Sequence, residues 1–116
     1  MRVYIASDLR TIKELLEIGQ AQIQEYLTPD QFEFDHEVDL ESREHLISQL
    51  ASEDSLELNN GRIGLVIAAD LSETQLIDEK LILGMDQVAG VLASRDGDEL
   101  SWFASDEIRF HLAEWE

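Results

Sequence analysis

The chain has 116 residues, of which 26 are Asp or Glu and 8 are Lys or Arg, so its formal net charge is -18 at pH 7. Because nucleic-acid backbones and anionic membrane surfaces repel such a charge, we expect no nucleic acid and no membrane as a partner. The lack of cysteine excludes disulfides and thiol chemistry. An apolar share of 44% at this length favours one folded domain over residues 1–116.

The first thirty residues predict a strand followed by a helix. Residues 1–6 form a β-favouring run. Ser7 or Asp8 can cap the helix that follows, and Gly19 is placed to end it. Residues 20–30 are mostly polar and predict a connection.

A second strand and a longer helix are predicted next. Residues 31–38 alternate between apolar and polar side chains, which is typical of a half-exposed strand. Asp39 then resembles an N-cap, and the helix that it begins ends near Leu58, before two asparagines and Gly61.

The second half of the chain predicts mainly strands. Residues 63–69 are almost continuously apolar, which indicates a strand covered on both faces at the middle of a sheet. Shorter strands are expected at 81–83 and 88–93. Asp96 and Gly97 supply turn chemistry for a hairpin that leads into the last strand.

The chain is expected to close on a helix capped by Ser105, with Ile108, Leu112 and Trp115 at i, i+4 and i+7. The predicted fold is therefore α/β: a single-domain mixed sheet of about five strands, with two main helices on one side and a C-terminal helix. Its expected core comprises Val3, Ile5, Leu65 and Ile67, backed by Ile12, Leu15, Leu16, Leu46, Ile47 and Leu50.

One cluster resembles a metal site, but its spacing argues against it. Its members are Asp35, His36, Glu37, Asp39, Glu41 and His45. In a strand, Asp35 and Glu37 point away from His36, and a helical pair such as Glu41 and His45 offers only two ligands. Such i, i+4 pairs, Glu107 and His111 included, more often stabilise a helix. The acidic turn at residues 96–99 lacks the spacing of a calcium loop. We expect no metal site.

The sequence also predicts no catalytic residues and no cofactor site. It has no nucleophile elbow, no glycine-rich phosphate loop and no HExxH motif. A hydrolase would instead require His36 or His45 to meet Asp70 or Asp86 in one pocket. The aromatic residues near the end favour core packing, with Trp115 as an alternative anchor for a partner.

Four segments resemble an uncharacterised family of short actinobacterial proteins. They are MRVYIASDLRTIKELLEIG, ESREHLISQLASEDSLEL, RIGLVIAAD and DELSWFASDEI, with the late ELxWFAxxEI pattern in the last. The resemblance implies a bacterial cytoplasmic origin and a compact α/β fold. It implies no activity, cofactor or site residue.

The functional expectation is a small acidic protein-interaction module. High negative charge combined with a full apolar core is not explained by disorder and favours a protein partner, one with a basic surface. A nucleic-acid mimic that binds a basic protein is one alternative, and a small-molecule-binding protein or hydrolase is another. The absence of a signal peptide or a membrane-length apolar stretch predicts a cytoplasmic location. The sequence leaves the oligomeric state open.

Overall fold

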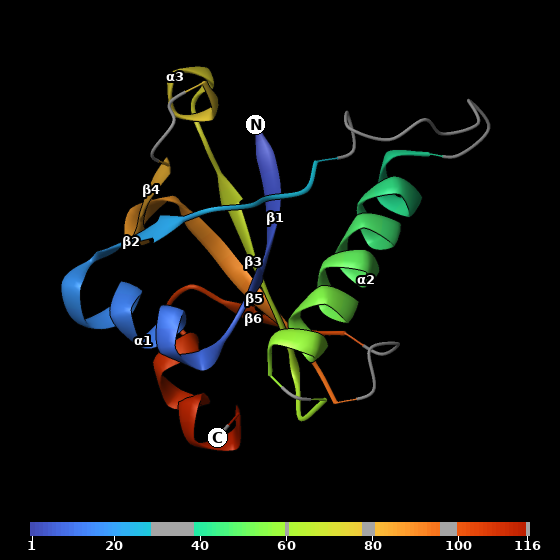
Figure 1. The fold of residues 1–116 in the computed structure, drawn as a ribbon, viewed down its shortest axis with the longest axis vertical. Helices are drawn as coiled ribbons and strands as arrows, with labels where there is room; N and C mark the ends of the chain where they lie inside the picture. Colours follow the sequence, from blue (N-terminus) through green and yellow to red (C-terminus); the bar gives the residue numbers. More distant parts are fainter. Residues whose placement is uncertain (29–38, 60, 78–80, 96–99, 116) are drawn as a thin grey trace.

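Two antiparallel sheets and three α-helices make up the computed structural model, which describes residues 1–28, 39–59, 61–77, 81–95 and 100–115 (Figure 1). The four-stranded sheet has the order β1 (Arg2–Ser7), β3 (Gly64–Asp70), β5 (Val88–Ser94) and β6 (Ser101–Ala104). The two-stranded sheet joins β2 (Gln20–Ile23) and β4 (Leu81–Gly84). The helices are α1 (Leu9–Ile18), α2 (Leu40–Leu58) and α3 (Glu73–Leu76). Short 3-10 helices lie at Met85–Gln87, Ile108–Phe110 and Leu112–Trp115.

The strand predicted for the middle of the sheet lies there. β3 pairs with β1 on one side and with β5 on the other, and its residues from Gly64 to Ala69 are all buried. A strand buried on both faces accounts for its near-continuous apolar sequence, because both layers of the protein pack against it.

Helix α1 forms as its capping signals predict. The Asp8 carboxylate accepts a hydrogen bond from the Thr11 amide at 2.8 Å, and Gly19 ends the helix with a left-handed φ of 91°. The residues after Gly19 differ from the prediction, because they form strand β2 instead of a connection. Ala21 and Ile23 point into the core while Gln20 and Gln22 face outward, so only alternate residues carry the apolar signal.

Helix α2 begins at the predicted cap, where Asp39 accepts from the Ser42 amide at 2.8 Å. The face that it buries differs from the prediction, since Leu46 and Leu50 are 43% and 41% exposed. Ile47 is buried as predicted, and the other described buried residues of the helix are Ser48, Ala51, Ser52 and Ser55. Small side chains are needed there because α2 lies close to β3: a Cβ added at Gly64 would lie 2.4 Å from Ser52 Oγ.

The two long helices cover opposite faces of the four-stranded sheet (Figure 1). Ile12 of α1 belongs to the core cluster that contains Ile5, whereas Ile47 of α2 packs with Tyr4. Neighbouring strand residues point to opposite faces, so the two clusters lie on opposite sides of β1. The α/β class is confirmed, but the helices are not on one side and the strands form two antiparallel sheets instead of one mixed sheet.

The end of the chain also differs from the predicted secondary structure. Residues after β6 form two 3-10 helices in place of the predicted α-helix, although Ile108 and Trp115 are buried as its apolar spacing indicated. The hairpin pairing of β5 with β6 is confirmed. The strand predicted at 31–38 and the turn at 96–99 lie outside the described residues.

The predicted core is largely confirmed. Seven of its members are buried, namely Val3, Ile5, Ile12, Leu15, Ile47, Leu65 and Ile67. Leu16 is partly buried against the same cluster, and only Leu46 and Leu50 are exposed. In the described part of the chain, no helix is both long enough and apolar enough to cross a membrane.

Candidate functional site

A large cavity lies beside the outer edge of β1. Tyr4 and Leu27 exchange two backbone hydrogen bonds there, at 2.9 and 2.8 Å, and form an isolated antiparallel bridge. The chain before Leu27 leaves this edge because β2 pairs with β4 instead. The last turns of α2 form the third wall of the opening. We call this cavity of about 690 Å³ the β1 groove; it is open to solvent.

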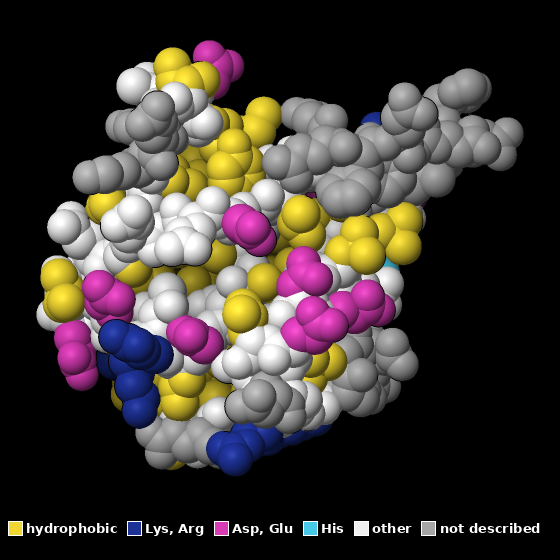
Figure 2. All heavy atoms as spheres, viewed as in Figure 1, with side chains coloured by type: hydrophobic (Ala, Val, Ile, Leu, Met, Phe, Trp, Pro, Cys, Tyr) yellow, Lys and Arg dark blue, Asp and Glu magenta, His cyan; other side chains and the backbone are white. Residues whose placement is uncertain are grey.

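Four carboxylates line the β1 groove. Asp8 follows β1, Glu25 lies on the segment before Leu27, and Asp54 and Glu57 project from α2. None of the described residues that line the groove is Lys or Arg. In Figure 2, several Asp and Glu side chains lie along α2 and toward the centre of this face and others lie at its left margin and top, whereas Lys and Arg are seen mainly at the lower left and the lower edge. The groove therefore carries a local negative charge.

Apolar side chains lie among these carboxylates. Leu58, at the end of α2, is 62% exposed and lines the groove together with Tyr4 and Tyr26. Burial, and then the negative charge of Glu44, raise the pKa of Tyr4 above its ordinary value. Carboxylates beside exposed apolar surface suit a ligand that has a positive end and an aliphatic part, such as a lysine or arginine side chain.

A catalytic site of the kind considered from the sequence does not assemble from the described residues. His36 lies outside them, and His45 is exposed on α2. Asp70 is engaged with Arg2, and Asp86 is exposed in the short 3-10 helix after β4. None of the three described cavities is lined by His45, Asp70 or Asp86.

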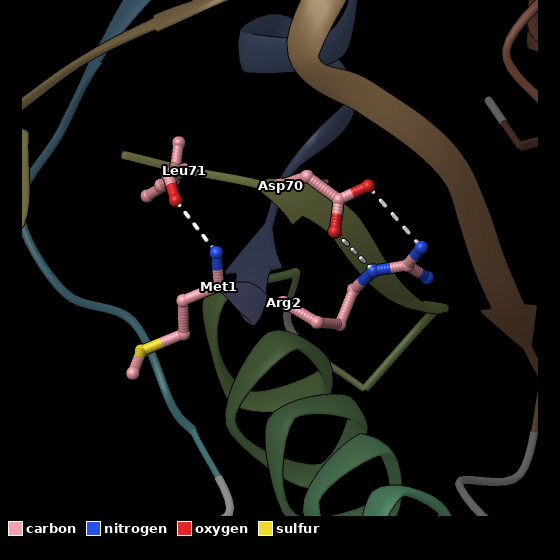
Figure 3. A network of polar contacts seen from close by, with 4 residues as sticks. All are labelled: Met1, Arg2, Asp70 and Leu71. Carbon is pink, nitrogen blue, oxygen red and sulfur yellow. Dashed lines mark hydrogen bonds and ion pairs between the residues drawn. The ribbon is translucent and has the colours of Figure 1, made fainter. Parts of the chain in front are cut away.

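Figure 3 shows how Asp70 is held. Arg2 Nε donates to Asp70 Oδ1 at 2.9 Å and the guanidinium donates to Oδ2 at 3.3 Å, while the Met1 ammonium donates to the Leu71 carbonyl at 2.7 Å. The hydrogen bond from Arg2, followed by the charge of that guanidinium, lowers the pKa of Asp70 below its ordinary value. These contacts tie β1 to β3, so Asp70 is a structural residue.

Three residues of the metal-like cluster, Asp39, Glu41 and His45, lie in the part of the chain that the structure describes. Asp39 caps α2, and no group of three or more His, Asp or Glu side chains in that part is arranged to hold a metal ion. His111 pairs with Glu114 at 3.0 Å and not with Glu107. Trp115 is buried against Phe103, with ring centroids 5.2 Å apart, so it belongs to the core and does not offer a surface anchor.

A second cavity of about 270 Å³ lies between the end of β5 and the C-terminal 3-10 helix. Arg95, Phe103, Glu114 and Trp115 line it, and the Arg95 guanidinium donates to the Glu114 carbonyl. Its described lining holds one cation, Arg95, and one carboxylate, Glu114, whereas that of the β1 groove holds four carboxylates and no cation, so this second cavity has the smaller net charge.

Comparison with protein-family models, with curated proteins and with solved structures finds no match. The resemblance of the four segments to the actinobacterial family stays a prediction. The β1 groove was not predicted either, because its residues come from β1, from the segment after β2 and from α2, and they form no motif along the chain. The excess of acidic residues was the one signal that pointed toward it.

Proposed function

We propose that this protein is a small acidic protein-interaction module and that its partner inserts a basic segment into the β1 groove. The observation that carries this proposal is a cavity of about 690 Å³ that combines four carboxylates with exposed apolar side chains and, among the described lining residues, has no Lys or Arg. A cavity of this size lies within the range of roughly 300–1,000 Å³ that is typical of ligand-binding sites.

The charge of the whole chain supports the same proposal. A net charge of -18 creates a negative potential around the protein, which attracts basic partners and raises their association rate. Within that field the groove adds shape, since Asp54 and Glu57 of α2 and Glu25 of the segment before Leu27 line the same cavity. A lysine or arginine in the groove would therefore lie near several carboxylates at once.

A direct test uses a short fluorescein-labelled peptide in which Lys alternates with Val, and measures its binding by fluorescence anisotropy at low and high salt. The groove variant Glu25→Gln/Asp54→Asn/Glu57→Gln should bind the peptide about tenfold more weakly. The reason is that three exposed ion pairs, each worth roughly 0.2–1 kcal/mol, are lost together. The peptide with Glu in place of Lys should not bind.

The matched control is the variant Glu17→Gln/Glu73→Gln/Asp106→Asn, which removes the same number of charges from exposed positions outside the groove. It should bind the basic peptide nearly as tightly as the unaltered protein. Equal weakening in both variants would contradict a groove-specific site and would favour the alternative of a nucleic-acid mimic that presents carboxylates over a broad surface. No binding of the basic peptide to the unaltered protein would overturn the proposed function.

A further inference from the structure

Among the described residues, the outer edge of β1 has backbone groups without a hydrogen-bond partner inside the β1 groove. In an antiparallel strand, the amide and carbonyl of one residue point to the same side, and successive residues alternate between sides. Tyr4 directs both groups outward, to Leu27, while Met1 directs both toward Leu71 next to β3. Ala6 follows Tyr4 by two residues, so its amide and carbonyl also point outward, into the groove that it lines.

Among the described residues, none forms a backbone hydrogen bond with Ala6 on this side. The bridge between Tyr4 and Leu27 is isolated, because the chain on the amino-terminal side of Leu27 turns away toward β2. Ala6 is paired with Val66 in the sheet on its other side, so its position is fixed. A fixed strand edge with a free donor and acceptor is a template for an added strand.

We infer that the β1 groove takes an extended basic peptide segment, which adds to the edge of β1 by pairing its backbone with Ala6. This inference rests on the proposed function and specifies how the partner binds. The occupant is basic because of the carboxylates around this edge, and it is extended because only an extended backbone presents an amide and a carbonyl in register with Ala6.

The two faces of the sheet determine which protein residues each peptide side chain would contact. The Ala6 side chain lies on the same face as Tyr4, which is the face covered by α2. A peptide side chain on that face would meet Asp54, Glu57 and Leu58. Lysine or arginine fits there, since its aliphatic part can pack on the exposed Leu58 while its charged end reaches the carboxylates. The next peptide residue would turn toward the start of α1.

The experiment measures amide hydrogen exchange by NMR in the free protein and in the protein saturated with the Lys–Val peptide. Exchange of the Ala6 amide should slow by at least about tenfold in the complex, because this amide gains a hydrogen bond that is broken only by local opening. The Tyr4 amide, which already donates to Leu27, is the internal control and should change little.

A second arm places a single N-methyl group at each backbone nitrogen of the peptide in turn, which removes one donor and leaves every side-chain charge in place. Binding should weaken about tenfold at a single position, because only the peptide amide that faces the Ala6 carbonyl would donate to β1, whereas the neighbouring Tyr4 carbonyl is already bonded to Leu27. Strand addition would be overturned if N-methylation at every position weakened binding equally and exchange of the Ala6 amide did not change. If binding still depended on Glu25, Asp54 and Glu57 in that case, the proposed function would stand. Absence of any groove-dependent binding would overturn both.

Discussion

Ser52 and Ser55 of α2 are both fully buried, but they differ in their hydrogen bonds. The Ser55 hydroxyl accepts from the Leu65 amide at 2.7 Å and donates to the Ser7 carbonyl at 2.5 Å, so it bridges paired residues of β1 and β3. Asn59 donates to the same Ser7 carbonyl. In contrast, Ser52 Oγ has no hydrogen-bond partner within the described structure. One serine connects three elements, and the other occupies the narrow space opposite Gly64.

This contrast predicts opposite effects of the same substitution. Ser55→Ala should lower the free energy of unfolding by roughly 1–3 kcal/mol, because it leaves the buried Leu65 amide without an acceptor, while the Ser7 carbonyl keeps the hydrogen bond from Asn59. Ser52→Ala should leave stability unchanged or raise it by about 1 kcal/mol, because it removes a buried hydroxyl that makes no hydrogen bond. Urea unfolding followed by circular dichroism measures both. A larger loss in Ser52→Ala than in Ser55→Ala would contradict the assigned contacts.

At the scale of the element, α2 is defined by small side chains on its buried face. Ser48, Ala51, Ser52 and Ser55 allow the helix to lie close to β3, and Ile47 is the large apolar side chain among them. Leu46 and Leu50 lie at the border of this face and are partly exposed. Among the described residues, the helix is therefore attached mainly through small side chains that allow close approach to the sheet, and through one large buried side chain, Ile47.

This packing predicts that one large residue of α2 dominates its attachment. Ile47→Ala should cost roughly 2–5 kcal/mol of unfolding free energy, the usual cost of truncating a buried isoleucine. Leu50→Ala, the matched control on the same helix, should cost about 1 kcal/mol, since much of its side chain already contacts water. Thermal and urea unfolding of both variants test this. Equal losses would indicate that Leu50 is as buried as the sequence pattern predicted.

At the scale of the whole molecule, charge is the dominant feature. With 26 acidic and 8 basic residues, most carboxylates have no basic partner available, and mutual repulsion opposes the compact state. Local ion pairs such as Arg2 with Asp70 offset only part of this repulsion. The same field that attracts a basic partner therefore lowers the stability of the free protein.

Salt should consequently have opposite effects on folding and on binding. Raising the salt concentration from 0.1 M to 1 M shortens the Debye length from about 10 Å to about 3 Å and screens both interactions. We expect the melting temperature of the free protein to rise and the affinity for the Lys–Val peptide to fall. Differential scanning calorimetry and anisotropy measure the two. The variant Glu17→Gln/Glu73→Gln/Asp106→Asn should show a smaller rise in melting temperature, and a melting temperature that falls with salt would contradict the argument.

The amino-acid sequence by itself determined the features that depend on neighbours along the chain. The caps at Asp8 and Asp39, the helix end at Gly19 and the apolar run of β3 each depend on a few consecutive residues, and each forms as predicted. The α/β class follows from the order of these elements. The short strand β2 was missed because only two of its side chains, Ala21 and Ile23, carry the apolar signal.

Only the tertiary structure decided the features that depend on residues far apart in sequence. Hydrophobic periodicity shows that a helix has an apolar face but not which side of the sheet receives it, so the opposite placement of α1 and α2 was not predicted. The buried face of α2 differed because close approach at Gly64 favours serine and alanine over leucine. The β1 groove also depends on contacts between distant residues. Leu27 pairs with Tyr4 of β1, whereas β2, a few residues earlier, pairs with β4. The space beside Ala6 lies between these two pairings, and no local sequence pattern encodes it.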